Sequence, residues 1–220
     1  MVELDRSLFA FFNQNLVNQY FDSLMPVITN EHYWTPFLVA LLLWLIFSSG
    51  GKYRFFALML CISVGSSDYL TAGIIKKKVK RLRPCCDIPE SRKLIGCLTG
   101  KSFPSAHAAN SSNLAFMLFF EMGTKVGLPA IFAAIVVAYS RVYVGVHYPI
   151  DVLTGFILGF LIAFIMTKIK EKIRNRPALE TCTLPEPPEN NGNSVTHDTI
   201  DNSNTLTQDL SHGSIGEREQ

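Results

Sequence analysis

Long apolar segments separated by short polar breaks fill the middle of the chain, and they restrict its possible folds more than any other feature. A bilayer core offers no water to backbone N–H and C=O groups, so a segment that crosses it is a helix or part of a closed barrel. About 20 apolar residues are enough for a helical crossing. The predicted spans are residues 33–49, 55–75, 105–122, 130–144 and 150–168. The sequence therefore predicts an all-α integral membrane helical bundle with about five transmembrane helices.

The bulk composition agrees with a membrane protein. Hydrophobic residues make up 48% of the 220 residues and charged residues 17%, and the mean hydropathy is +0.22 although a long polar tail is included. The net charge of +2 is too small to favour nucleic acid as a partner. No secretory signal is evident, because residues 1–6 carry two acids and the first sustained apolar run begins later. The bilayer is the expected partner.

The N-terminal segment, residues 1–32, is predicted to be amphipathic. Apolar side chains recur at helical spacing between residues 7 and 28. The polar side chains that interrupt them are Asn13, Gln14, Asn15, Asn18, Gln19 and Asp22. Such groups are unfavourable in hydrocarbon. Two interpretations stay open: a helix that lies in the membrane interface, and a helix that packs over the bundle as a lid.

The other end of the chain, residues 174–220, is predicted to be a disordered polar tail. It has scattered Pro, Asn, Ser, Thr and acidic residues with few aliphatic ones, and such a composition does not bury enough surface to fold. The predicted organisation is an amphipathic segment (1–32), one transmembrane domain (33–173) and this tail.

The stretch 140–151 places many polar groups at a junction between two apolar segments. Pro149 favours the first position of a helix, so Asp151 lies in the first turn. From there its carboxylate can accept a proton from one ring nitrogen of His147, fix the tautomer and leave the other nitrogen as a base or nucleophile. Arg141 offers a planar fork of donors for phosphate or carboxylate oxygens. The alternative is an ordinary turn at the membrane edge.

Two more polar stretches border the apolar segments. Residues 104–107 open the third predicted helix, whose free backbone N–H groups form an anion site. Lys76 and Arg83 follow the second predicted helix, and Lys76 is the expected partner of Asp68 within that span. Because five crossings put all three polar stretches on one side of the membrane, we expect them to form one site.

Together these stretches resemble the three-part signature of the type 2 phosphatidic acid phosphatase (PAP2) family. The matching blocks are Lys76 with six residues before Arg83-Pro84, then Pro104-Ser105-x-His107, then Ser140-Arg141 with five residues before His147 and three more before Asp151. The order and all internal spacings agree. The one departure is Ala106, where many members carry glycine, and a backbone N–H remains available there.

The resemblance implies a mechanism. His147, oriented by Asp151, is the implied nucleophile that forms a phosphohistidine, and His107 is the implied general acid. The implied phosphate-binding residues are Lys76, Arg83, Ser105, Ala106 and Arg141. No metal and no cofactor are implied, because the cationic side chains take the role that a metal ion plays elsewhere.

The resemblance also implies a lipid phosphate as substrate, since the site opens at the membrane surface. Undecaprenyl diphosphate is the leading expectation, ahead of phosphatidic acid, phosphatidylglycerol phosphate and lipid A phosphates. The basic side chains that would hold a second phosphate are Lys77, Lys78, Lys80 and Arg81. Lys and Arg are about equally frequent at the two membrane faces, so their distribution gives no orientation. Because bacterial members usually act on the outer face of the inner membrane, we expect the site outside and the tail inside. The sequence predicts no oligomeric state.

Two other kinds of function are weighed against a lipid phosphatase. One is a non-enzymatic membrane scaffold or transporter that binds an anion at the same cluster, but binding alone needs neither two histidines nor Asp151. The other is an enzyme for soluble substrates of the vanadium haloperoxidase or acid phosphatase branch, which five predicted spans disfavour.

Three cysteines share the loop between the second and third predicted spans. If this loop faces an oxidising compartment, Cys85 or Cys86 can pair with Cys97. Zinc is the less favoured interpretation, because the loop has no histidine of its own. Cys61 and Cys182 are expected to be free thiols.

Overall fold

The computed structural model describes residues 2–48, 50–97 and 100–175, which form helices joined by loops with no β-strand among them. The helices are α1 (Val2–Ala10), the π-helix η1 (Phe11–Asn15), α2 (Gln19–Thr29), α3 (Glu31–Phe47), α4 (Gly51–Asp68), the π-helix η2 (Tyr69–Ile75), α5 (Lys76–Val79), α6 (Pro84–Asp87), α7 (Ala106–Met122), α8 (Thr124–Tyr143) and α9 (Pro149–Arg174). The predicted all-α class is confirmed. The tail predicted for residues 174–220 lies, beyond Asn175, outside the described residues.

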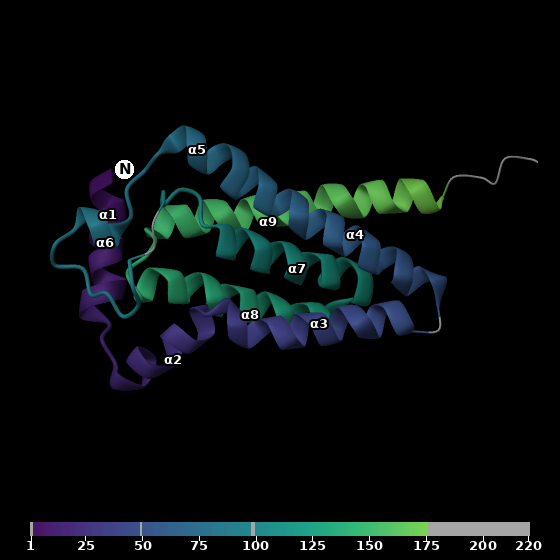
Figure 1. Ribbon diagram of the computed structural model, residues 1–220, viewed down its shortest axis with the longest axis horizontal. Helices are drawn as coiled ribbons and strands as arrows, with labels where there is room; N and C mark the ends of the chain where they lie inside the picture. Colours follow the sequence, from purple (N-terminus) through teal and green to yellow (C-terminus); the bar gives the residue numbers. More distant parts are fainter. Residues whose placement is uncertain (1, 49, 98–99, 176–220) are drawn as a thin grey trace, which may run out of the picture. The chain divides into compact units, whose positions relative to one another are not determined.

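Five long helices carry the predicted spans, and in Figure 1 they run along a common direction. Three helical stretches are long and apolar enough to cross a membrane: Gly51–Asp87, Thr124–Tyr143 and Pro149–Arg174. α3 is apolar but shorter, with 17 residues. α7 also has 17 residues, and it contains several serines and asparagines. The protein is thus an integral membrane protein built from helices.

α7 packs between α8 and α9, so it is the central helix of this part of the bundle (Figure 1). Its contact with α9 is close because α9 carries glycine where the two backbones meet. A Cβ atom on Gly159 would overlap Ser112 Oγ and the carbonyl oxygen of Ala109. Asn113 Nδ2 donates to the carbonyl oxygen of Gly159 at 3.3 Å. Small and polar residues of this kind let membrane helices approach each other closely.

The turn between α7 and α8 is shorter than the predicted turn 123–129. Gly123 alone makes the turn, with a φ of 76°, and α8 begins at Thr124. One residue is enough because glycine adopts a positive φ without a steric penalty. Pro129 therefore lies inside α8, where the sequence had indicated a turn. α9 also extends further than predicted, to Arg174.

The N-terminal segment is helical but divided into α1, η1 and α2. Asn18 begins α2, and its side chain accepts a hydrogen bond from the backbone N–H of Tyr20 at 2.8 Å. The segment packs on the bundle, because Asp5 and Asn13 are completely buried. Asn13 Nδ2 donates to the carbonyl oxygen of Tyr143 at 2.8 Å. These contacts attach the N-terminal segment to the bundle.

A buried ion pair joins α7 to α9 near their ends away from α1. Lys170 Nζ contacts Glu121 Oε2, and both side chains are almost fully buried. Lys52 Nζ of α4 lies 3.4 Å from the other carboxylate oxygen of Glu121. The ion pair therefore ties together three of the long helices.

Candidate active site

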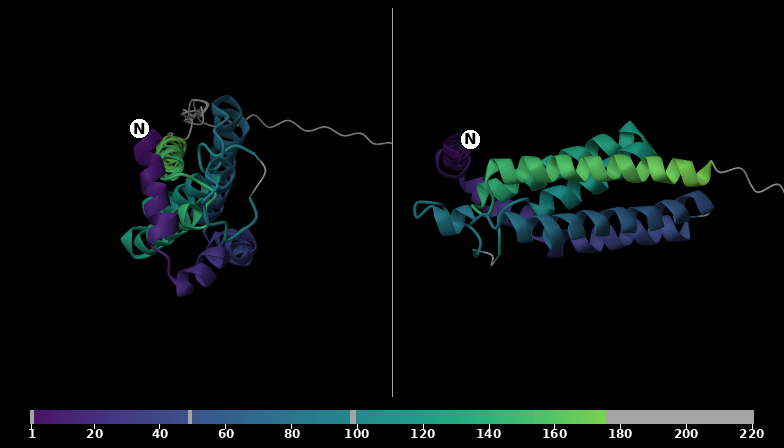
Figure 2. Two further views of the ribbon diagram at one scale, coloured as in Figure 1. Left: turned by 90° about the vertical axis from the view of Figure 1, so that its left-hand side faces the viewer. Right: turned by 90° about the horizontal axis from the view of Figure 1, so that it is seen from above.

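The three polar stretches singled out in the sequence meet at one end of the bundle. α5 and α8 end there, and α7 and α9 begin there (Figure 1). α6 and the loop segments 80–83, 88–97 and 100–105 lie at the same end. Both views in Figure 2 place α1 there as well, and α1 contacts α9.

His147 lies in the short connection between α8 and α9 and is 1% exposed. Its Nε2 is 3.2 Å from Arg83 Nη1, and its Nδ1 is 3.4 Å from Ser102 Oγ. A guanidinium group only donates, so Nε2 accepts and Nδ1 carries the ring proton. The unprotonated nitrogen of His147 therefore faces Arg83.

The surroundings of His147 also keep the ring neutral. Burial lowers the pKa of His147 from 6.5 to about 3, and the nearby charges of Arg141 and Arg83 act in the same direction, while Asp151 opposes them. Burial has this effect because it disfavours the charged form of an imidazole. At neutral pH Nε2 therefore keeps its lone pair, which accepts from Arg83.

Asp151 is completely buried at the start of α9. Its Oδ1 accepts from Arg81 Nη1 at 2.6 Å, and its Oδ2 accepts from the hydroxyl of Ser102. Oδ2 also accepts from the backbone N–H of Tyr148 at 3.0 Å. The expected direct hydrogen bond with His147 is absent, since Oδ2 lies 3.8 Å from Nδ1. Ser102 instead bridges the two side chains.

Two buried arginines flank His147. Arg83 is 5% exposed and donates through Nη1 to the carbonyl oxygen of Val146 at 3.2 Å. Arg141 is 2% exposed and donates through Nη1 to Thr29 Oγ1 at 2.6 Å. The Nε atom of each arginine has no partner among the described residues. Buried donors without a partner are unfavourable, so two of them here fit an anion as their natural partner.

His107 lies in the first turn of α7 and is partly exposed. Lys76, Arg83 and Arg141 are all near enough for their charges to act on its ring. Its Nε2 lies 3.7 Å from Glu31 Oε2 at the start of α3, a neighbour that the sequence did not predict. Both histidines thus share one cationic environment.

The expected pairing of Lys76 with Asp68 is wrong for the described residues. Asp68 Oδ1 accepts instead from Asn110 Nδ2 of α7 at 3.2 Å. The π-helix Tyr69–Ile75 lies between the two residues. A π-helix has more residues per turn than an α-helix, so Lys76 emerges at a different angle from the one that helical spacing predicts.

Ser105 and Ala106 lie at the N-terminus of α7. Ser105 Oγ accepts from the backbone N–H of Ala108 at 3.5 Å, and its backbone N–H donates to the carbonyl oxygen of Asp151 at 3.0 Å. Ala106 is the first residue of the helix, so its N–H is among the free groups that favour an anion.

Arg81 does not extend toward a phosphate site. Besides its contact with Asp151, Arg81 Nη2 lies 2.5 Å from Asp5 Oδ2. The predicted use of Arg81 for a second phosphate is therefore wrong in this structure. Lys77, Lys78 and Lys80 are exposed and form no ion pair in the described part of the chain.

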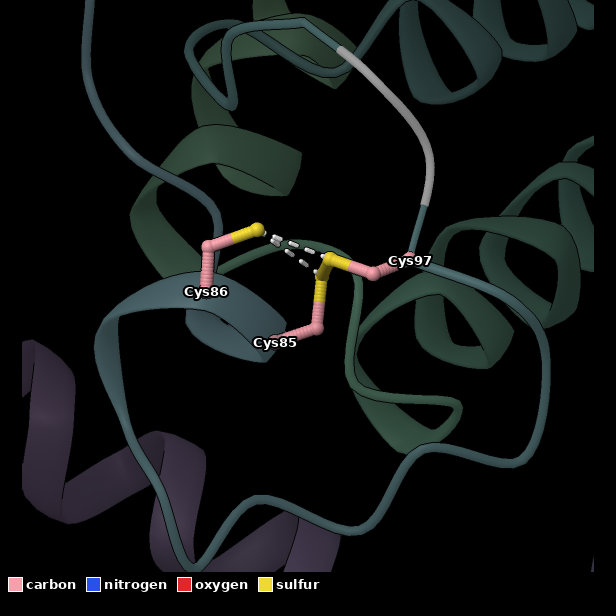
Figure 3. Close-up of side chains that lie close together, drawn as sticks. All are labelled: Cys85, Cys86 and Cys97. Atoms are coloured by element: carbon pink, nitrogen blue, oxygen red, sulfur yellow. Dashed lines mark hydrogen bonds between the residues drawn. A yellow bond between two sulfur atoms is a disulfide. The ribbon is translucent and has the colours of Figure 1, made fainter.

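The loop cysteines lie close together (Figure 3). Cys85 and Cys97 form a disulfide, with their Cα atoms 5.8 Å apart, and Cys86 Sγ is 3.0 Å from Cys97 Sγ. These sulfur atoms are the one group within residues 2–48, 50–97 and 100–175 with a spacing that suits a metal ion. Because two of them are joined to each other, they do not form a set of three free thiolates.

Sequence reasoning missed several residues that contact the site. Ser102 precedes the second block by two positions, outside its fixed pattern. Arg81 was grouped with a basic run. The others, Asp5, Thr29 and Glu31, belong to the N-terminal segment, and no spacing links them to the three blocks.

Comparisons with known proteins find a matching family model and similar proteins. A family model described as the PAP2 superfamily matches residues 56–175. Lipid A 4'-phosphatase from Bacteroides thetaiotaomicron is 26% identical over 160 residues, which cover 70% of this chain and 71% of that protein. Undecaprenyl-diphosphatase from Sulfolobus acidocaldarius is 32% identical over 126 residues, which cover 57% of each chain.

One solved structure extends the similarity to the fold. It is the crystal structure of the first transmembrane PAP2 type phosphatidylglycerolphosphate phosphatase from Bacillus subtilis. The TM-score is 0.63 at 25% identity, and the match covers 80% of this chain and 89% of that one.

Proposed function

The chain belongs to the PAP2 superfamily, and from this premise we propose that it hydrolyses a phosphate group from a membrane lipid through a phosphohistidine at His147. The observation that carries the proposal is the neutral, buried His147, whose unprotonated Nε2 faces Arg83. Anion binding alone would not need a nucleophile held in this way.

The substrate phosphate binds where the cationic groups converge. The free Nε–H groups of Arg83 and Arg141 donate to its oxygens, and Lys76 adds a third positive charge. The N-terminus of α7, with the backbone N–H of Ala106, adds further donors. Donors fixed in advance stabilise the charge of the transition state without reorganising during the reaction.

The reaction has two steps. Nε2 of His147 attacks phosphorus, and the P–N bond forms as the P–O bond to the lipid breaks. His107 is protonated once the negative charge of the bound phosphate offsets the surrounding cations, and it gives its proton to the leaving oxygen. His107 then takes a proton from water, and the hydroxide displaces His147 from phosphorus, which releases inorganic phosphate. The proton on Nδ1 is held by Ser102 and Asp151, which stabilise the positive ring of the intermediate.

We propose that no metal ion takes part, because the arginine and lysine side chains neutralise the phosphate. Turnover of a lipid phosphate by the purified protein is expected to persist in EDTA and to be inhibited by vanadate, which mimics the trigonal-bipyramidal phosphoryl group. His147→Ala should remove both turnover and an acid-labile phosphoenzyme. Loss of turnover in EDTA that is restored by magnesium or zinc would refute the metal-free mechanism.

The proposed substrate is a lipid diphosphate, with undecaprenyl diphosphate as the leading candidate. Support comes from the relative named undecaprenyl-diphosphatase and from the exposed Lys77, Lys78 and Lys80 beside Lys76. Lipid monophosphates are the second candidate, because Arg81 is already paired with two carboxylates. The relatives named for lipid A and for phosphatidylglycerolphosphate fit that class.

A substrate panel separates the two classes. It contains undecaprenyl diphosphate, farnesyl diphosphate, phosphatidylglycerol phosphate, phosphatidic acid and a lipid A phosphate at equal surface concentration in detergent micelles. We expect a diphosphate to give the highest kcat/KM. Combined replacement of Lys77, Lys78 and Lys80 by Gln should lower kcat/KM for diphosphates more than for monophosphates.

The matched control replaces exposed lysines of α9, Lys168 and Lys172, by Gln. This control should leave the ranking of substrates unchanged. Fastest turnover of a monophosphate, or an equal loss for both classes in the triple variant, would leave only the broader lipid phosphatase assignment.

We also propose that the site faces outward, at the external surface of a bacterial inner membrane, with the tail inside. Support comes from the disulfide between Cys85 and Cys97 in the loop beside the site, because disulfides persist in oxidising compartments and are rare in the cytosol.

A further inference from the structure

One guanidinium group joins α1 to the start of α9. Arg81 Nη1 lies 2.6 Å from Asp151 Oδ1, and Arg81 Nη2 lies 2.5 Å from Asp5 Oδ2. Both carboxylates are completely buried. The planar fork of an arginine fixes the relative position of two such partners, which the point charge of a lysine does not.

Two more contacts hold Arg81 and Asp5 in place. The ring of Tyr148 lies against the guanidinium, with Arg81 Cζ 4.0 Å from the ring centre. Asp5 Oδ1 accepts from the backbone N–H of Ile150 at 3.0 Å. Asp5 therefore satisfies a free N–H group in the first turn of α9, where a negative charge is favourable.

The contacts continue from Asp151 to His147. Asp151 Oδ2 accepts from the hydroxyl of Ser102, whose oxygen lies 3.4 Å from Nδ1 of His147. Asp151 cannot move without changing the partner that holds the ring proton. The path runs from α1 to His147 through Asp5, Arg81, Asp151 and Ser102.

We infer that Asp5, Arg81 and Ser102 are positioning residues for the nucleophile: α1 holds Arg81, Arg81 holds Asp151, and Ser102 transmits the position of Asp151 to the Nδ1 proton of His147. This inference rests on the proposed function for its kinetic consequence. It assigns a catalytic contribution to the N-terminal segment, which lies outside the family match at residues 56–175.

The structure offers a matched control for this arrangement. Arg92 also comes from the loop between the second and third spans and also pairs with the N-terminal segment, since Arg92 Nη2 lies 2.6 Å from Asp22 Oδ2. It likewise lies over a tyrosine ring, with Cζ 5.8 Å from the centre of Tyr143. Arg92 contacts neither His147 nor Asp151.

The experiment compares Arg81→Met and Arg92→Met in the full-length protein in detergent, with Arg81→Lys and Asp5→Asn as milder variants. An open pocket of about 470 Å³ is lined by Asp5, Arg81 and Tyr148. Thermal unfolding measures the folded fraction. Single-turnover kinetics give the rate of phosphoenzyme formation per folded molecule, and the ¹⁵N chemical shift of Nδ1 in labelled histidine reports the hydrogen bond that His147 makes at this atom.

Arg81→Met is expected to slow phosphoenzyme formation about tenfold or more, by analogy with the loss of an outer partner of a metal-bound histidine. The effect on KM should be smaller, and the Nδ1 signal of His147 should shift as its hydrogen bond to Ser102 weakens. Arg81→Lys and Asp5→Asn should show smaller changes in the same direction. Arg92→Met should keep the wild-type rate and ring signals, even if it unfolds at a lower temperature.

The inference fails if Arg81→Met behaves like Arg92→Met, with lower stability but an unchanged rate and an unchanged Nδ1 signal. Failure of the proposed function looks different: wild-type protein would then hydrolyse no lipid phosphate. In that case the Nδ1 signal still decides, because a wild-type signal in Arg81→Met refutes the positioning path, and a shifted signal in Arg81→Met but not in Arg92→Met supports it.

Discussion

At the scale of single residues, the two histidines of the site differ in what surrounds them. His147 is enclosed between Arg83 and Ser102 and has a fixed tautomer. His107 is partly exposed on α7, with Glu31 at 3.7 Å. A nucleophile profits from a fixed lone pair, whereas a general acid exchanges protons with leaving groups and water, so the proposed division of roles follows these surroundings.

The division of roles predicts how His107→Ala behaves. General-acid help matters most when the leaving oxygen is basic, so this variant should lose activity on alkyl phosphates by about 10²-fold or more. It should lose much less on activated aryl phosphates, as kcat for the two substrate types can show. Equal losses on both would indicate that His107 only binds phosphate.

The buried state of His147 predicts a pH dependence of stability. The pKa of about 3 in the folded protein lies below the ordinary 6.5, so the unfolded chain binds more protons between these values. The stabilising contribution is complete above pH 6.5 and is lost as the pH falls toward 3. Thermal unfolding of wild type and His147→Gln should therefore diverge in pH dependence below 6.5, with wild type losing more stability. Parallel curves would contradict a depressed pKa.

At the scale of elements, the closeness of α7 and α9 positions two of the three blocks, because Ser105 directly precedes α7 and Asp151 lies in the first turn of α9. The two residues are linked directly, since the backbone N–H of Ser105 donates to the carbonyl oxygen of Asp151. The packing that holds this register depends on Gly159 two turns further along α9. Any residue larger than glycine there separates the helices.

Gly159→Ala tests this dependence. The added Cβ meets Ser112 and the backbone of Ala109, so the variant should lower the free energy of unfolding by about 1–3 kcal/mol, as overpacking usually does. Gly65→Ala in α4 is the control, because nothing lies within 4 Å of its added Cβ. Thermal unfolding in detergent should show a lower Tm for the first variant alone.

The sequence predicted the elements and the signature residues because both depend on local patterns. Apolar runs predict helices, and Pro149 predicts the start of α9, where the structure has it. Contacts between residues that are far apart in the sequence leave no such pattern. Asp5, for example, binds Arg81, which is 76 residues further along the chain. The sequence paired Lys76 with Asp68 because the spacing of apolar residues does not reveal the π-helix between them. It did not identify Ser102, because no local sequence pattern predicts that its hydroxyl donates to Asp151.

At the scale of the whole molecule, the proposed orientation in the membrane predicts the outcome of a thiol-labelling experiment. Cys61, Cys86 and Cys182 are replaced by serine, and the disulfide is kept. A new cysteine at the exposed Glu90 should react with an impermeant thiol reagent in intact cells, and one at the exposed Arg174 should react only after lysis. The reverse pattern would place the site in the cytoplasm and exclude an outer-leaflet substrate.

The buried ion pair between Glu121 and Lys170 bears on biosynthesis. α7 leaves the ribosome with an acidic side chain, serines and asparagines whose partners include α9, the last helix in the described part of the chain. Until α9 emerges, insertion of α7 would expose these groups to lipid, where each is unfavourable. We therefore expect stable insertion of α7 to require α9, although α7 is made first. A chain that ends before residue 149 is expected to insert α7 poorly.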